Sequence, residues 1–314
     1  MSTATLCDFL RHLKITRKKD SLRCRTASRR CGLPASRMGQ TLRVYRHEKT
    51  CVHRRNVGEN EHDSAVGLPR RTLFGTLAFS RFYELSGQGD NKMLPSKIAA
   101  SMMCADFLHL EKDVADLEKA DVEYLHFDIM DGVFVPNLML CNEMMKGLRR
   151  ATKIPYDVHL MVVNPEQKIK WFDLNHDDIV SVHYESTPHI HRAIQEIQHA
   201  GAKPAIALNP ATPVGCIEHV LPDVAMVLLM TVNPGFASQK LVEQTLHKIK
   251  TTREFLDDKG YEDIILQVDG NCSFSNIPRM RAKGADCFVA GSSSVFSKET
   301  TIVAACKKLR EVMG

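Results

Sequence analysis

The sequence predicts an α/β fold, a (β/α)₈ TIM barrel preceded by a basic N-terminal extension of low order, on three observations. Short apolar, β-branched runs alternate with longer amphipathic stretches from Met93 onward, as in β/α units that build a parallel sheet. Eight such units fit into residues 93–314, slightly fewer residues than the roughly 250 of most such barrels. A doubly wound open sheet is the alternative, but it usually has a glycine-rich turn after its first strand, and Ser101–Cys104 contains no glycine.

The predicted strands are short runs rich in Val, Ile, Leu and Ala between polar or turn-forming residues. In chain order they are residues 97–103, 124–130, 156–162, 178–184, 203–209, 225–232, 263–270 and 287–292. Amphipathic patterns between these runs predict the helices. The clearest are Phe107–Lys119, Asn142–Arg150, Pro165–Leu174, His189–Ala200, Lys240–Lys259, Ile277–Lys283 and Thr301–Met313.

Residues 1–92 differ in composition from the rest of the chain. Residues 1–90 contain 18 Lys and Arg against 8 Asp and Glu, whereas the remainder contains 24 against 29, so the net charge of +5 arises in this extension. A basic, Ser-rich and acid-poor segment is typical of an organelle-targeting presequence. Translation that starts at Met93 and a functional basic arm are the alternatives. We therefore expect a barrel domain at 93–314, in the cytoplasm, or in an organelle if residues 1–92 are a transit segment.

Composition also argues against several classes of protein. No run of 18 apolar residues is present, so no transmembrane helix or membrane partner is expected. The ten cysteines are scattered without a C-x-x-C pair, which indicates a reducing compartment rather than a disulfide-rich or zinc-ribbon protein. The extension has few aromatic residues and no recognisable nucleic-acid module, so no nucleic-acid partner is expected.

Polar side chains occupy interior positions in two predicted strands. Alternation puts His126 and Asp128 on one face of 124–130, and His159 on the corresponding face of 156–162. A single inward histidine is more often a hydrogen-bonded core residue than a metal ligand. Two polar residues in one strand, matched at another strand end, favour a shared site, because a buried carboxylate is costly unless it is paired.

The strand 263–270 adds a second carboxylate, because it ends at Asp269. In a closed barrel these strand ends meet at one mouth, where active sites of this fold lie. Two imidazoles and two carboxylates suit one divalent ion, either Zn²⁺, Fe²⁺, Mn²⁺ or Co²⁺. The expected ligands are His126, Asp128, His159 and Asp269.

Three further strand ends continue into turns rich in small residues, Thr231–Gln239, Asp269–Asn271 and Ala290–Ser294. Small residues there allow backbone N–H groups to approach a phosphate, as the phosphate sites of barrels require. One such turn alone is weak evidence, but three in one quadrant of a barrel indicate a phosphate-binding site.

Several stretches together resemble the ribulose-phosphate 3-epimerase family. They are His126–Asn137 (HFDIMDGVFVPN), Asp157–Val162 (DVHLMV), Asn209–Pro213 (NPATP), Met230–Phe236 (MTVNPGF), Gln267–Gly270 (QVDG) and Gly291–Ser292. The resemblance covers residues 95–314 and implies a ribulose-phosphate-binding barrel. It also implies an isomerase of the pentose-phosphate pathway that inverts C3 of D-ribulose 5-phosphate, through an enediolate, to give D-xylulose 5-phosphate.

The same resemblance implies roles for individual residues. One divalent metal ion would be held by the four ligands named above, and Asp128 and Asp269 would also be the acid/base pair. Ser101 and His159 would contact the sugar phosphate, and the enzyme would form a homo-oligomer through helical faces. The phosphate would lie against Gly235, Phe236, Ala237, Ser238, Gly270, Asn271, Gly291 and Ser292.

Because of two departures from the family pattern, the sequence does not decide whether the sugar phosphate has five or six carbon atoms. The common Gly-Phe-Gly-Gly-Gln appears as Gly235–Gln239 (GFASQ), and Val-Asp-Gly-Gly-Val as Val268–Cys272 (VDGNC). The second change resembles D-allulose-6-phosphate 3-epimerases, which would convert D-allulose 6-phosphate to D-fructose 6-phosphate. A related lyase or decarboxylase would place a lysine at a strand end, and none is present. A non-catalytic protein would not explain the four expected ligands.

Overall fold

The computed structural model describes residues 94–139 and 142–314, so the extension predicted for residues 1–92 lies outside the described residues. The described part is built on one nine-stranded sheet. Its strands are β1 (Lys97–Ser101), β2 (Tyr124–Asp131), β3 (Leu138–Met139), β4 (Tyr156–Met161), β5 (Ile179–His183), β6 (Lys203–Leu208), β7 (Met226–Met230), β8 (Ile265–Asp269) and β9 (Cys287–Ala290).

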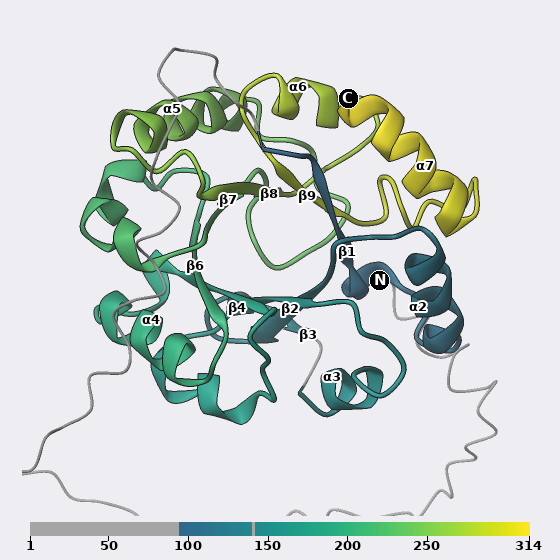
Figure 1. Cartoon of the computed structure of the whole chain (residues 1–314), viewed down its shortest axis with the longest axis horizontal. Helices are drawn as coiled ribbons and strands as arrows, with labels where there is room; N and C mark the ends of the chain where they lie inside the picture. The colour runs from purple at the N-terminus through teal and green to yellow at the C-terminus, as the bar shows by residue number, and fades with distance from the viewer. Residues whose placement is uncertain (1–93, 140–141) are drawn as a thin grey trace, which may run out of the picture. The chain divides into compact units, whose positions relative to one another are not determined.

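The sheet closes on itself and forms the barrel that the sequence predicts (Figure 1). The strand order is β1-β9-β8-β7-β6-β5-β4-β2-β3, and β1 also pairs with β2. Every neighbouring pair is parallel except β2 with β3, which is antiparallel. Among the described residues this leaves eight parallel strands in the closed barrel, and the predicted fold class is confirmed.

Helices surround the barrel on the outside (Figure 1). No helix among the described residues has the length and apolar character needed to cross a membrane. The α-helices are α2 (Leu110–Lys119), α3 (Asn142–Leu148), α4 (Ile190–His199), α5 (Gln244–Asp258), α6 (Ile277–Arg281) and α7 (Ile302–Met313).

The predicted helix Pro165–Leu174 is wrong. Two single 3₁₀ turns, Pro165–Gln167 and Ile169–Trp171, take its place. Lys168 lies between them with its ammonium turned back toward the end of β2, where it donates to Asp131 Oδ2 over 2.8 Å. This anchor and the burial of Pro165 and Ile169 favour two separate turns over a continuous helix.

The strand β3 and the connection from β6 to β7 have no counterpart in the prediction. The strand β3 pairs with the end of β2, where Met139 is opposite Met130. A 3₁₀ segment, Val214–Asp223, connects β6 to β7 and contains Pro222. Proline lacks the N–H that an α-helix interior requires, so a helix is disfavoured in this connection.

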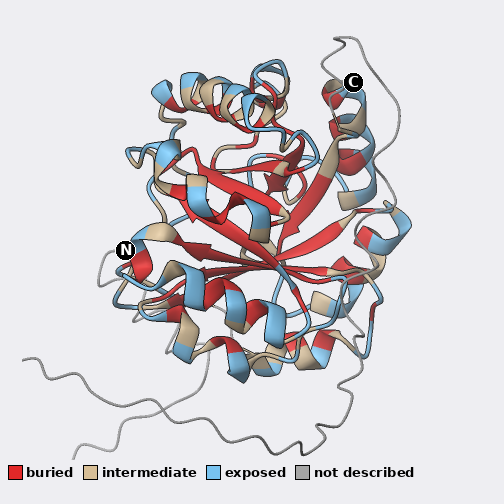
Figure 2. Ribbon diagram, turned by 60° about the vertical axis from the view of Figure 1, so that its left-hand side comes forward, coloured by how far each residue is buried: buried red, intermediate tan, exposed pale blue. Residues whose placement is uncertain are grey.

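The strands are buried on both faces (Figure 2). Apolar residues such as Leu125 and Phe127 face the helices and form the main core. Inside the barrel, the layer nearest the start of the strands is apolar and includes Tyr124, Ile179 and Met226. The next layer along the strands is polar.

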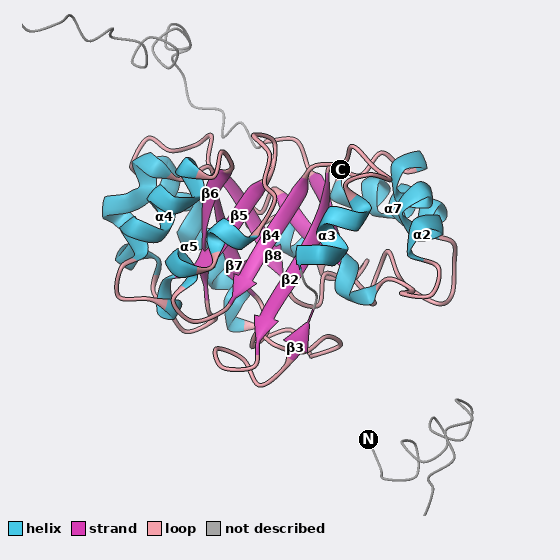
Figure 3. Ribbon diagram, turned by 90° about the horizontal axis from the view of Figure 1, so that it is seen from below, coloured by secondary structure: helices cyan, strands magenta, loops and turns pink. Residues whose placement is uncertain are grey.

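Strand register brings the polar layer to one end of the barrel. Asp128 pairs with His159 between β2 and β4, and Ser101 pairs with His126 between β1 and β2. The arrowheads of β2 and β4 point toward the end of the barrel where β3 lies (Figure 3). The predicted ligands therefore meet at the carboxyl ends of the strands.

Candidate metal centre and active site

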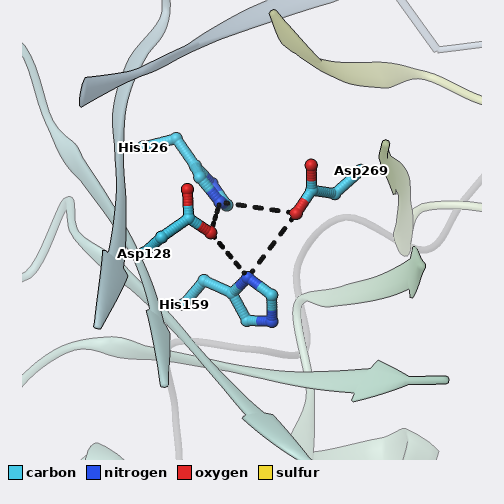
Figure 4. Close-up of side chains that lie close together, drawn as sticks. All are labelled: His126, Asp128, His159 and Asp269. Carbon is cyan, nitrogen blue, oxygen red and sulfur yellow. Dashed lines mark hydrogen bonds and ion pairs between the residues drawn. The ribbon is translucent and has the colours of Figure 1, made fainter. Parts of the chain in front are cut away.

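Four side chains from β2, β4 and β8 converge at this end of the barrel (Figure 4). Asp128 Oδ1 lies 3.3 Å from His126 Nε2 and 3.2 Å from His159 Nδ1. Asp269 Oδ2 lies 4.0 Å from His126 Nε2 and 3.7 Å from His159 Nδ1. One ligand atom from each residue lies within 4.8 Å of those of the other three.

This cluster fits one metal ion in both donor chemistry and spacing. Two imidazole nitrogens and two carboxylate oxygens form a donor set that Zn²⁺ and other transition-metal ions accept. A tetrahedral ion with bonds of about 2.1 Å separates its ligand atoms by about 3.4 Å. The four nitrogen–oxygen separations, 3.2–4.0 Å, are close to that value, and all four ligand atoms lie within 4.8 Å of one another. The cluster is therefore able to hold one divalent ion.

The two carboxyl groups differ in their proton affinity. Burial opposes ionisation of Asp128, but the charges and hydrogen bonds of His126 and His159 outweigh burial and hold its pKa well below the usual range. Burial and the neighbouring charge of Asp128 raise the pKa of Asp269 to about 6. The two groups therefore differ in proton affinity where no metal ion is bound, and a bound divalent ion would lower the pKa of both.

A cavity of about 350 Å³ opens beside the cluster and is lined by Asp128 and Asp269. Ser101 is also on its wall and donates from Oγ to Asp128 Oδ2 over 3.2 Å. His159 is not on the wall and has no exposed surface. The residues predicted to bind the phosphate all line the cavity: Gly235, Phe236, Ala237, Ser238, Gly270, Asn271, Gly291 and Ser292.

Three glycines of the family pattern are replaced, at Ala237, Ser238 and Asn271, and the last two keep a glycine-like backbone. Ser238 has φ +61° and Asn271 has φ +49°, in the left-handed region that favours glycine but that asparagine also tolerates. The Asn271 amide donates to the carbonyl of Gln239 over 2.7 Å, and Ser238 Oγ lies 3.3 Å from Ser292 Oγ. These contacts link the loops after β7, β8 and β9, so the departures do not require a different backbone path.

Gly270→Ala should disturb the turn after β8 and weaken binding of the sugar phosphate that the resemblance leads us to expect there. A Cβ there would lie 2.6 Å from Val232 Cγ2, at φ +123°. A side chain in this backbone region costs on the order of 1–3 kcal/mol. We expect a lower free energy of unfolding in denaturant and a higher KM. Gly201→Ala is the matched control, because Gly201 also has positive φ, at +86°, but its Cβ would meet no atom within 4 Å. An unchanged KM in Gly270→Ala would contradict the expectation that the phosphate lies against this turn.

Sequence reasoning gave no role to several polar residues behind the cluster. His183 and Gln267 are fully buried inside the barrel, and Glu185 accepts from His183. Burial lowers the pKa of His183 to about 4. Asp157 accepts from His126 Nδ1 over 2.6 Å and from Gln267 over 2.6 Å. Alternation along the strand 178–184 places Ser181 and His183 on one face, a pattern that could have identified His183.

Comparison with known proteins gives consistent matches. The sequence model described as "Ribulose-phosphate 3 epimerase family" matches residues 97–296. Ribulose-phosphate 3-epimerase of Bacillus subtilis is 44% identical over 197 residues, which cover 63% of this chain and 91% of that protein. The chloroplastic ribulose-5-phosphate-3-epimerase of Arabidopsis thaliana is 41% identical over 204 residues, covering 64% of this chain and 72% of that protein.

Solved structures show the same fold at low sequence identity. KGPDC from Streptococcus mutans has a TM-score of 0.51 at 11% identity, covering 70% of this chain and 98% of that chain. A 3-hexulose-6-phosphate synthase has a TM-score of 0.51 at 14% identity, covering 69% of this chain and 100% of that chain. At these identities the likeness concerns the barrel alone.

Proposed function

The chain belongs to the ribulose-phosphate 3-epimerase family, and we propose that Asp128 and Asp269 carry out its proton transfers. The enzyme is an isomerase that inverts C3 of D-ribulose 5-phosphate to give D-xylulose 5-phosphate. The observation that supports the residue assignment most directly is that these two carboxyl groups belong to one cluster and both line the cavity, one from β2 and the other from β8.

Inversion at C3 requires two proton transfers on opposite faces of the sugar. The proton α to the C2 carbonyl leaves to one carboxylate, and a second carboxyl group returns a proton from the other side. Asp128 and Asp269 reach the cavity from β2 and β8, so they can serve opposite faces. A divalent ion held by the cluster would supply Lewis-acid stabilisation of the negative charge that develops on the substrate.

Neighbouring groups orient the carboxylates and limit water. Ser101 holds Asp128 Oδ2 through its hydroxyl. Met130, Met161 and Met230 line the cavity and are almost fully buried, so they present apolar surface near the reacting carbons. Exclusion of water protects a carbanion-like intermediate from side reactions.

We propose that the phosphate lies at the end of the cavity formed by the loops after β7, β8 and β9. Backbone N–H groups in such turns bind anions, and the glycines there allow the backbone to approach closely. The residues assigned to it are Gly235, Phe236, Ala237, Ser238, Gly270, Asn271, Gly291 and Ser292.

We propose that residues 93–314 are the catalytic unit and that the extension has another role. The family match begins at residue 97. A cleaved targeting segment would place the barrel in an organelle, and a chain translated from Met93 would remain in the cytoplasm. We still predict that the enzyme forms a homo-oligomer. We also predict that it binds neither nucleic acid nor a membrane.

The substrate can be tested by measuring turnover of D-ribulose 5-phosphate and D-allulose 6-phosphate side by side. The full chain and residues 93–314 should both prefer the pentose, because the relatives compared above are named for ribulose phosphate and two of the three replaced glycines, at Ser238 and Asn271, keep a glycine-like backbone. A preference for the hexose would move the assignment to the allulose enzyme. Loss of folding in the shorter chain would show that the extension is structural.

A further inference from the structure

We propose that His183 and Glu185 are positioning residues for the metal centre. They form a one-way hydrogen-bond chain that fixes which nitrogen of His159 carries the proton, and so keeps the Nδ1 lone pair of His159 directed at the ligand cluster. The inference rests on the proposed role of His159 as a metal ligand.

The two ring nitrogens of His159 face different partners. Nδ1 lies 3.2 Å from Asp128 Oδ1, on the side of the cluster. Nε2 lies 2.9 Å from His183 Nε2, and the two rings are stacked with centroids 5.0 Å apart. A nitrogen that binds a metal ion carries no proton, so a neutral His159 must hold its proton on Nε2. His159 therefore donates to His183 Nε2.

The direction of the next bond follows from the first. His183 accepts at Nε2, so its own proton is on Nδ1, which lies 3.2 Å from Glu185 Oε2. The other oxygen, Oε1, accepts from the backbone N–H of Asn209 over 2.9 Å and from the hydroxyl of Thr212. An ionised carboxylate only accepts. The chain therefore runs in one direction, from His159 through His183 to Glu185.

Burial makes this chain the only route by which the His159 Nε2–H can be satisfied among the described residues. His159 and His183 have no exposed surface, and Phe134 packs on the His183 ring with centroids 4.7 Å apart. A buried donor without an acceptor is destabilised. The second ligand, His126, is held in a parallel way, because its Nδ1 lies 2.6 Å from Asp157 Oδ2. Such outer partners typically fix the orientation and tautomer of a ligating histidine.

The test measures Co²⁺ affinity of the full-length protein by competition with a metal-binding dye, together with the visible absorption of bound Co²⁺. His183→Phe keeps a ring against Phe134 but removes the acceptor. We expect about 10–100-fold weaker Co²⁺ binding and a changed spectrum, the usual cost of losing an outer partner of a ligand. His183→Gln offers an amide oxygen to the His159 N–H and should recover most of the affinity.

Glu185→Gln tests the direction of the chain with almost no change in shape. Its amide oxygen must still accept from Asn209 and Thr212, so its NH₂ would face His183 Nδ1. His183 would then have to accept at Nδ1 and donate at Nε2, where it would oppose the His159 N–H. Co²⁺ binding should weaken by about 10–100-fold here as well.

Asp178→Asn is the matched control for loss of a buried carboxylate. Asp178 has no exposed surface, precedes β5 at the opposite end of the barrel and accepts from Tyr156 N over 2.8 Å. This variant should melt at a lower temperature but bind Co²⁺ as the unmodified protein does. Unchanged Co²⁺ affinity in both His183→Phe and Glu185→Gln would overturn the inference and leave the proposed function standing. Failure of the unmodified protein to bind Co²⁺ would remove the metal centre and the inference together.

Discussion

Asp269→Asn should lower kcat by on the order of 10²–10⁴-fold, the share that general acid–base catalysis typically contributes. Asparagine has nearly the same shape as aspartate and keeps an oxygen toward the cluster, but it can neither take nor return a proton. Asp128→Asn should have an effect of the same size for the same reason. Steady-state turnover of D-ribulose 5-phosphate measures both variants.

Proton exchange in D₂O separates the roles of the two carboxyl groups. If each serves one face of the sugar, each variant keeps the group that removes the C3 proton from one of the two epimers. Asp128→Asn should then exchange the C3 proton of one pentulose phosphate and Asp269→Asn that of the other, without net inversion. Asp178→Asn, distant from the cavity, should lose stability but keep its kcat. Turnover near that of the unmodified enzyme in either site variant would contradict the two-carboxylate mechanism.

Residues that follow strand periodicity could be placed from the sequence. His126 and Asp128 are two residues apart in one strand, so they had to share a face, and the structure puts both inside the barrel. Asp269 is on a distant strand, so its position near His126 and Asp128 could be predicted only by assuming that the sheet closes into a barrel. The pairing of β1 with β2 confirms that closure. Strand periodicity thus predicted which side chains face the interior. Closure of the barrel then placed those side chains close enough together to form one site.

Features that depend on contacts between strands could not be predicted in this way. The bond between His159 and His183 needs the β4–β5 register, in which His159 is opposite Ser181, and the bond from His183 to Glu185 needs the turn after β5. The wrong helix at Pro165–Leu174 has a similar cause. Its amphipathic pattern was real, but the contact of Lys168 with the end of β2 is not encoded in local spacing.

Removal of the metal should reduce turnover to background and lower the melting temperature of the protein. A ligand that binds only the folded state at 100 times its Kd contributes about 2.7 kcal/mol. For a barrel of this size that corresponds to a shift of roughly 5–10 °C. The measurement is turnover and thermal melting after treatment with a chelator and dialysis, with the metal content checked by elemental analysis. Addition of Zn²⁺, Fe²⁺, Mn²⁺ or Co²⁺ should restore both properties for at least one ion.

His159→Gln is the control that links these effects to the cluster. Glutamine is a poor ligand for such ions, so the melting temperature of this variant should respond much less to chelator or added metal. If the four polar residues were only a hydrogen-bonded core layer, metal-free protein would keep its full turnover and its melting temperature would not depend on metal. That outcome would contradict the metal centre, because hydrogen bonds within the protein are unaffected by a chelator. Loss and recovery of both properties together would mean that one bound ion supports folding and catalysis at the same four side chains.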